Sequence, residues 1–232
     1  MNYRYLILLI VVLAIAPVSV VQAQGRGFDT STLRLQAKAD NLYRKGHWER
    51  AHFIYVNELA AKGDKYSQYM AGYMCMHGKG VERDKIRASA WYRLAAERDG
   101  PEFVAIRDQT LETMSEEEML ESDAIFVDLR QRYSDLVLML DDIEEEREAM
   151  SETPTGSRLS GSSSAITVID PATGDTIARN EYLRRLEKRM QVKLDYLAEK
   201  LGSGPLDPDM SDGEFRELRD RVGEYLQAVN DR

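Results

Sequence analysis

The sequence predicts a mainly α-helical protein: a short α-solenoid of helix–turn–helix units with a long capping helix, then a small β-hairpin and a C-terminal helical hairpin. Three observations predict this fold. Apolar residues recur at helical spacing from Thr32 to Met150, a span that contains one proline, Pro101. Small residues recur at a fixed separation within that span, which is typical of a helical repeat array. Two further amphipathic stripes of helical period lie in residues 180–232.

The N-terminal residues 1–23 have the order of a secretory signal peptide. Arg4 precedes an apolar run from Leu6 to Val21, and Val21 and Ala23 supply the small residues of a cleavage site. We therefore expect an exported protein, periplasmic or secreted, cleaved after Ala23. The alternative is an uncleaved span, which would make the protein a membrane-tethered scaffold.

The composition argues against nucleic-acid and lipid partners and excludes an internal disulfide bond. The formal net charge is −9, which argues against nucleic acid because phosphate contacts need clustered Lys and Arg. The same acidity disfavours adsorption to anionic lipid, so we expect no membrane contact unless the signal is uncleaved. Cys75 is the only cysteine, so the chain can form no internal disulfide and must be stabilised by packing.

Two successive units share small and aromatic residues at matching positions. Ala51, Tyr55 and Gly63 recur 37 positions later as Ala88, Tyr92 and Gly100. Glycines between the apolar segments predict the turns. We expect one helix–turn–helix unit over residues 32–63, a second over 64–100, and a degenerate third after Pro101.

The second unit carries a specific set of spaced residues. They are Gly72, Tyr73 and Met74, then Gly78, Gly80, Val81 and Asp84, then Ala88, Trp91, Tyr92, Ala95 and Ala96. This set resembles a complete Sel1-like repeat, a longer-looped relative of the tetratricopeptide repeat, and the unit before it resembles a plain tetratricopeptide unit. The resemblance implies an exported bacterial scaffold or adaptor that binds a protein partner at the cell envelope. Some exported relatives have been linked to binding or hydrolysing β-lactams, but they carry paired cysteines in each repeat.

A stripe of tyrosine and methionine lies on the first helix of the second unit, and it consists of Tyr66, Tyr69, Met70, Tyr73 and Met74. Tyr and Met suit recognition surfaces, and the first helices of helical repeats line the inner surface of the array. We predict that this stripe binds the partner. Packing between repeats is the alternative. Gly72 and Cys75 fall on the opposite flank, where a neighbouring helix can come close.

The rest of the chain divides by composition. Ser115 and Glu118 form a capping-box pattern, and a heptad seam from Phe126 to Ile143 predicts one long helix that closes the repeat domain at residues 32–150. Residues 151–164 are rich in Ser, Gly and Thr and predict a flexible linker. Residues 165–179 predict a β-hairpin, and residues 180–232 a helical hairpin.

Reactive sites are not predicted. His47, His52 and His77 lack metal-ligand spacing, and His77 points away from Cys75 on a helix, which leaves that thiol without a base. The loop of Gly78 to Gly80 lacks a phosphate-binding pattern, and the acidic loop from Asp207 lacks calcium-loop spacing. We therefore expect no catalytic residue, cofactor or metal.

The function predicted is thus non-catalytic: an interaction scaffold or adaptor in the bacterial periplasm that binds an unidentified protein through its repeats. Two alternatives remain open. The heptad seam and terminal helices would build a structural homo-oligomer, or the chain is an exported hydrolase related to the β-lactam-binding repeat proteins.

Overall fold

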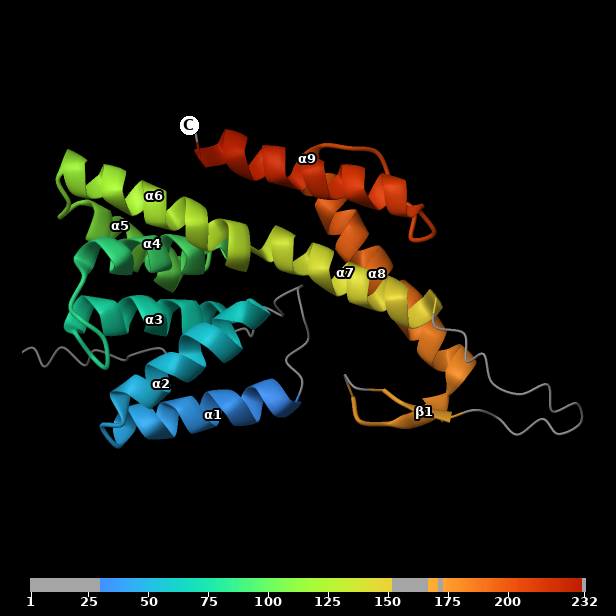
Figure 1. Ribbon diagram of the computed structural model, residues 1–232, viewed down its shortest axis with the longest axis horizontal. Helices are drawn as coiled ribbons and strands as arrows, with labels where there is room; N and C mark the ends of the chain where they lie inside the picture. The colour runs from blue at the N-terminus through green and yellow to red at the C-terminus, as the bar shows by residue number, and fades with distance from the viewer. Residues whose placement is uncertain (1–29, 152–166, 171–172, 231–232) are drawn as a thin grey trace, which may run out of the picture.

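The computed structural model describes residues 30–151, 167–170 and 173–230 (Figure 1). These residues are mainly helical, with one two-stranded sheet, which confirms the predicted fold class. Helices α1 to α6 form a stack, and α7 leads from it to α8, α9 and the hairpin (Figure 1). The predicted signal peptide and residues 152–164 of the predicted linker lie outside the described residues.

The first repeat unit consists of α1 (Thr30–Arg44) and α2 (Trp48–Ile54). The second helix continues as a π turn, η1 (Tyr55–Leu59), and a 3-10 turn, η2 (Ala60–Lys62). Gly63 ends this unit with φ of 76°, in the left-handed region that glycine enters at no steric cost. A core shared with the second unit holds this unit in place, built from Ala39, Ala51, Ile54, Tyr55 and Leu59 of the first unit and from Met70 and Met74 of the second.

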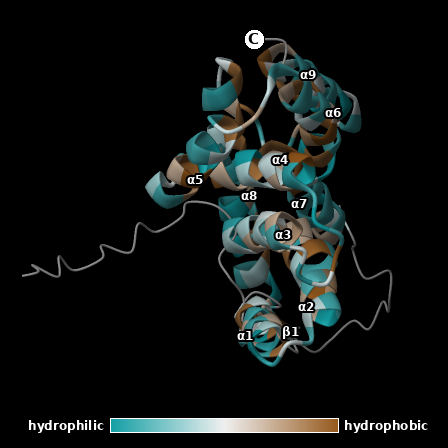
Figure 2. Cartoon of the chain, turned by 90° about the vertical axis from the view of Figure 1, so that its left-hand side faces the viewer, coloured by the Kyte–Doolittle hydropathy of each residue, from teal (hydrophilic) through white to brown (hydrophobic). Residues whose placement is uncertain are grey.

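The second unit consists of α3 (Lys65–His77), α4 (Lys85–Ala95) and the 3-10 turn η3 (Ala96–Arg98). An aspartate caps each helix: Asp64 accepts a hydrogen bond from the Ser67 amide and Asp84 from the Arg87 amide. Gly78 ends α3 with φ of 61°. In Figure 2, where the repeat helices are seen nearly end-on, α3 lies between α1 below and α4 above.

Two glycines let the backbones of the repeats approach closely. A Cβ at Gly72 of α3 would lie 2.8 Å from ring carbons of Tyr92 and 3.1 Å from the Ala88 carbonyl oxygen on α4. A Cβ at Gly80 would lie 2.4 Å from the Trp48 carbonyl carbon at the start of α2. Gly72 therefore sets the spacing within the second unit, and Gly80 seats its loop on the first unit.

The stack ends with α5 (Pro101–Leu111) and α6 (Glu116–Tyr133). The Ser115 hydroxyl accepts from the Glu118 amide and the Glu118 carboxylate accepts from the Ser115 amide, so the predicted capping box is present. Helix α6 runs along α4 (Figure 1) and places Leu129 in the core of the second unit.

The predicted capping helix is interrupted. Ser134 has an extended backbone, with ψ of 150°, and a second helix, α7 (Asp135–Ser151), begins after it. The heptad seam is split at this point: Phe126, Leu129 and Tyr133 pack on the repeats, whereas Leu136, Leu140 and Ile143 pack in another core. The expectation of one continuous helix is therefore wrong at Ser134, because the two halves of the seam serve different cores.

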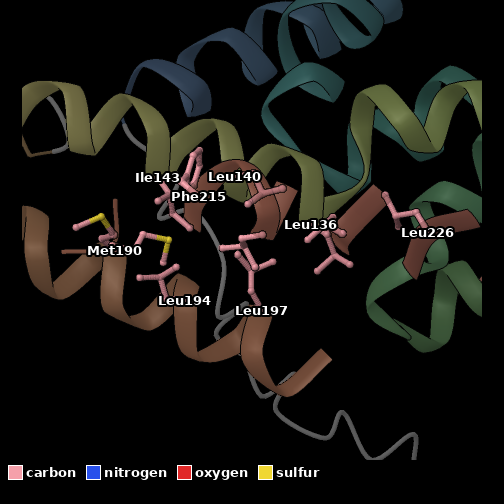
Figure 3. Packing of buried hydrophobic residues seen from close by; sticks show 11 residues of the cluster. Leu136, Leu140, Ile143, Met190, Leu194, Leu197, Phe215 and Leu226 are labelled. Atoms are coloured by element: carbon pink, nitrogen blue, oxygen red, sulfur yellow. The ribbon is translucent and has the colours of Figure 1, made fainter. Parts of the chain in front are cut away.

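The second core joins α7 to α8 (Arg179–Leu201) and α9 (Asp212–Asn230). Leu136, Leu140 and Ile143 of α7 lie against Met190, Leu194 and Leu197 of α8, and Phe215 and Leu226 come from α9 (Figure 3). We name α7, α8, α9 and the hairpin the C-terminal module. Its helices are also paired by charge, since Arg189 and Lys193 of α8 contact Glu146 of α7.

The predicted β-hairpin consists of β1 (Thr167–Ile169) and β2 (Thr176–Ala178), paired antiparallel with Val168 opposite Ile177. It docks on α8 through Asp170, which is fully buried and lies 3.5 Å from Arg185 and 3.7 Å from Arg189. An isolated hairpin is only marginally stable in water, so this anchor gives it a fixed place.

A buried ion network connects the repeats to the C-terminal module. Asp135, at the start of α7, lies 3.2 Å from Lys65 Nζ and 2.6 Å from Arg98 Nε. Lys65 also contacts Glu97 at 2.9 Å, and the Glu97 carboxylate accepts from the Asp135 amide. Burial alone would raise the pKa of Asp135, but Lys65 and Arg98 offset that effect and hold its pKa below the ordinary value.

We expect Gly72→Ala to lower the free energy of unfolding by about 1–3 kcal/mol, because the added Cβ would overlap the Tyr92 ring. Urea unfolding followed by circular dichroism measures the loss. Gly223→Ala on α9 is the matched control: no atom lies within 4 Å of its added Cβ, and alanine should stabilise that helix by about 1 kcal/mol. Equal stability of Gly72→Ala and the parent would contradict the close approach.

We expect Asp135→Asn to cost about 3–5 kcal/mol at neutral pH, because Lys65 and Arg98 lose a buried partner. The folded pKa of Asp135 is depressed, so its stabilising contribution is present above the unfolded pKa of about 3.9 and is lost as the pH falls through the folded value. The difference from the parent should therefore shrink in acid.

Urea unfolding across the pH range from neutral to acid measures that difference. The control is Asp141→Asn, which removes a half-exposed pair with Arg219 and should cost less than about 1 kcal/mol. A gap between Asp135→Asn and the parent that stays constant into acid would show that the Asp135 charge is not what stabilises the junction.

Candidate functional site

Aromatic side chains gather on the first helix of each unit. Tyr43 comes from α1, Tyr66, Tyr69 and Tyr73 from α3, and Phe103 from α5. We name these five side chains the aromatic face. The three tyrosines of α3 share one side of the helix because they are spaced three and four residues apart.

The rings of the aromatic face contact one another across the helices. Tyr73 meets Tyr43 edge-on at 6.3 Å between centroids, and Tyr69 lies 6.2 Å from Tyr73 and 5.9 Å from Phe103. Tyr66 lies 6.3 Å from Tyr69. Such separations are typical of favourable aromatic pairs. The rings therefore form a continuous row from α1 to α5.

Buried tyrosines support this row from behind. Tyr92 of α4 stacks on Tyr69 at 5.7 Å, and Tyr55 meets Tyr66 at 6.4 Å. The hydroxyl of Tyr55 donates a 2.6 Å hydrogen bond to Asp40 Oδ1 on α1, and the Tyr66 hydroxyl reaches the same oxygen at 3.5 Å. These contacts fix the orientation of Tyr66 and Tyr69, since their rings are held on two sides.

Four tyrosines of this region, Tyr43, Tyr55, Tyr66 and Tyr69, have raised pKa values. Burial raises the pKa of Tyr55, Tyr66 and Tyr69, and the Asp40 carboxylate adds to the effect at Tyr55 and Tyr66. Burial and the neighbouring Tyr73 hydroxyl likewise raise the pKa of Tyr43. These four hydroxyl groups are therefore neutral near pH 7 and can donate as well as accept hydrogen bonds.

The structure separates the five residues of the predicted stripe. Tyr66 is 36% exposed, and Tyr69 and Tyr73 are partly exposed. Met70 and Met74 are 7% and 0% exposed and belong to the core shared with the first unit. These two methionines do not reach the surface, because α1 and α2 pack over them, and this corrects their assignment to the predicted partner-binding surface.

Sequence reasoning missed Asp40, Tyr43 and Phe103. Each comes from a helix other than α3, so only the packing of the stack brings them beside the stripe. Asp40 and Tyr43 are three residues apart on α1, as Tyr66 and Tyr69 are on α3, and this spacing was the one available signal.

The repeat-defining residues build the frame behind the aromatic face. Ala88, Trp91, Tyr92, Ala95 and Ala96 are all buried at α4 and its end. Gly78, Gly80 and Asp84 shape the loop between α3 and α4. The Lys79 ammonium in this loop lies 4.0 Å from the Trp48 ring, so the predicted repeat loop is fastened to the first unit.

The residues weighed for reactive chemistry have structural surroundings. Cys75 is 1% exposed, and burial raises the pKa of its thiol to about 11, which is unlike a reactive thiolate. Burial and Arg87 lower the pKa of His52. Ser211 caps α9 with Glu214, so the acidic loop before α9 serves a helix start. Within residues 30–151, 167–170 and 173–230, no group of three His, Cys, Asp or Glu side chains is placed to hold a metal.

None of the helices in the described part of the chain is both long enough and apolar enough to cross a membrane.

Comparison with known proteins identifies the second unit. Residues 65–100 match the family model of the Sel1 repeat, which confirms the predicted resemblance and spans α3, α4 and η3. Sel1 repeats generally mediate protein–protein interaction. No curated protein and no solved structure matches the chain.

We expect Cys75 to react slowly with a disulfide reagent such as DTNB while the protein is folded, because its thiol is buried and protonated. The absorbance of the released thiolate measures the rate at mildly alkaline pH. Unfolding in guanidinium chloride is the control and should make the reaction fast. A folded protein that reacts as fast as the unfolded chain would contradict the burial of this thiol.

Proposed function

We propose that this chain is a non-catalytic interaction scaffold that binds a segment of a partner protein on the aromatic face of its Sel1-repeat stack. The observation that carries the proposal is the continuous row of rings on the first helices of the units, in which Tyr66 is exposed and Tyr69 and Tyr73 are partly exposed. Tyrosine is enriched among the residues that dominate binding energy at protein interfaces.

The rigidity of the face supports a binding role. Tyr66 and Tyr69 are held by the buried rings of Tyr55 and Tyr92, and these side chains come from helices rather than loops. Because these rings are already ordered, binding of a partner costs little conformational entropy in the tyrosine side chains. Apolar ring faces next to hydroxyl donors also suit a peptide, which presents both side chains and backbone carbonyl groups.

The homo-oligomer alternative relied on the heptad seam and the two terminal helices. Leu136, Leu140 and Ile143 are buried against α8 and α9 of the same chain, and Leu129 is buried on the repeats. These four residues of the seam are thus already covered within one copy of the chain. We therefore favour a binding surface on the repeats over an interchain bundle.

We further propose that the scaffold works in the bacterial periplasm or outside the cell. The support is the signal-peptide pattern of residues 1–23, and the acidic net charge is compatible with a soluble exported protein. N-terminal sequencing of the protein recovered from the periplasm of an expressing bacterium tests this, with a new terminus at Gln24 as the expected result. A protein that stays in the cytoplasm with Met1 intact would contradict it.

Site-specific crosslinking tests the binding face. Benzoylphenylalanine placed at Tyr66 should give one discrete partner adduct on illumination in cells, because this side chain is exposed beside the row of rings. The controls are Phe53 on α2 and Leu120 on α6, which are 57% and 70% exposed and lie off the aromatic face. Adducts of equal yield from the controls, or none from position 66, would contradict the proposal.

The identified partner then allows a binding measurement. Tyr66→Ala should weaken its affinity by about 1–2 kcal/mol, roughly tenfold in Kd, because the largest exposed ring of the face is removed. Phe53→Ala is the matched control, since it also deletes an exposed ring from the repeat region. An unchanged Kd for Tyr66→Ala would move the binding surface elsewhere.

A further inference from the structure

Only one oxygen of the Asp40 carboxylate accepts hydrogen bonds from the described residues. Both hydrogen bonds from Tyr55 and Tyr66 end on Oδ1, and within the described residues Oδ2 accepts none. The side chain is half-buried on α1 beside the aromatic face. A carboxylate in such a place loses hydration, and an opposite charge is the partner that best restores its interactions.

Within the described residues, no lysine or arginine side chain stacks on the rings beside Asp40. Among the described residues, lysine and arginine side chains stack on Trp48, Phe126, Tyr133, Tyr196 and Phe215. None of these rings belongs to the aromatic face. Arg44 lies one turn from Asp40 on α1, but it is exposed and forms no ion pair with Asp40 in the described structure.

A cation is the ligand group that suits both features. It is attracted to the negative face of a tyrosine ring and to a carboxylate at the same time. Arginine suits the site better than lysine, because its planar guanidinium can stack on a ring while its N–H groups reach a carboxylate oxygen. The net charge of −9 would also favour the approach of a basic segment.

We infer that the aromatic face binds a basic side chain, preferentially arginine, in an extended segment of the partner. The guanidinium stacks on the Tyr66 ring and donates an N–H hydrogen bond to Asp40 Oδ2. This inference rests on the proposed function and specifies the chemistry of the partner. Asp40 supplies the charge selectivity, while the rings of α3 supply the contact area.

The test uses the full chain and a displayed library of random peptides. Peptides that bind are expected to share one arginine or lysine. Each is then synthesised with arginine and with citrulline, which has nearly the same shape but no charge. Binding is measured by fluorescence anisotropy to the parent, to Asp40→Asn, and to Asp220→Asn, an exposed site on α9 that gives the same change in net charge.

Asparagine keeps an oxygen that can accept from Tyr55 and Tyr66, so Asp40→Asn removes the charge and leaves the hydroxyl contacts. We expect citrulline to weaken binding to the parent by about tenfold and to have a smaller effect on Asp40→Asn, where only the attraction of the cation to the Tyr66 ring remains to be lost. Asp220→Asn should behave as the parent. Selected peptides without a basic residue, no enriched peptide, or an equal citrulline effect in parent and Asp40→Asn would each overturn the inference.

The same experiment distinguishes failure of this inference from failure of the proposed function. If neutral peptides are selected and Tyr66→Ala abolishes their binding, the face is a recognition surface and only the preference for a cation is wrong. If Tyr66→Ala leaves the affinity of every selected peptide unchanged, the aromatic face is not the binding surface, and both proposals are wrong.

Discussion

The buried carboxylate of Asp135 is the constraint on which the arrangement of the two halves depends. It joins the start of α3 through Lys65, the end of the second unit through Arg98, and the start of α7 through its own backbone. Removing charges from water costs several kcal/mol for each ion, and that cost is offset only while all the partners stay in place. A rotation of the C-terminal module would separate them.

Arg130 strengthens the same junction, because it lies 3.9 Å from Glu97 and donates to the Leu226 carbonyl of α9. The aromatic face is thus presented at a fixed orientation to the module.

The local features of the fold were predictable from the sequence because short-range rules decide them. Gly72, Gly78 and Gly80 sit where no side chain fits or where φ is positive, and Ser115 and Ser211 cap helices as their spacing indicates. The break at Ser134 was missed because an apolar heptad persists across it, and periodicity alone does not show whether the backbone is continuous. The serine was the available sign, since its hydroxyl accepts from the Val137 amide as an N-cap would. Which core each half of the seam enters depends on tertiary packing.

The candidate site was predictable only in part, for a related reason. Helical spacing put Tyr66, Tyr69 and Tyr73 on one side of α3, and the structure keeps them together. It did not show where that side ends, so Met70 and Met74 were grouped with the tyrosines although the first unit covers them. Asp40 and Phe103 are brought in by helices on either side, and no pattern within one helix reports such a meeting. A site built across repeats therefore needs the geometry of the stack.

The contact between the backbones of Gly80 and Trp48 limits which insertions and deletions the repeat stack can accept. Surface loops usually accept inserted or deleted residues, because few contacts fix their path. The loop between α3 and α4 touches the neighbouring unit backbone to backbone and is fastened by Lys79 on the Trp48 ring. One residue more or fewer would shift both contacts away from α2. Insertions or deletions in this loop would therefore loosen the packing of the second unit on the first.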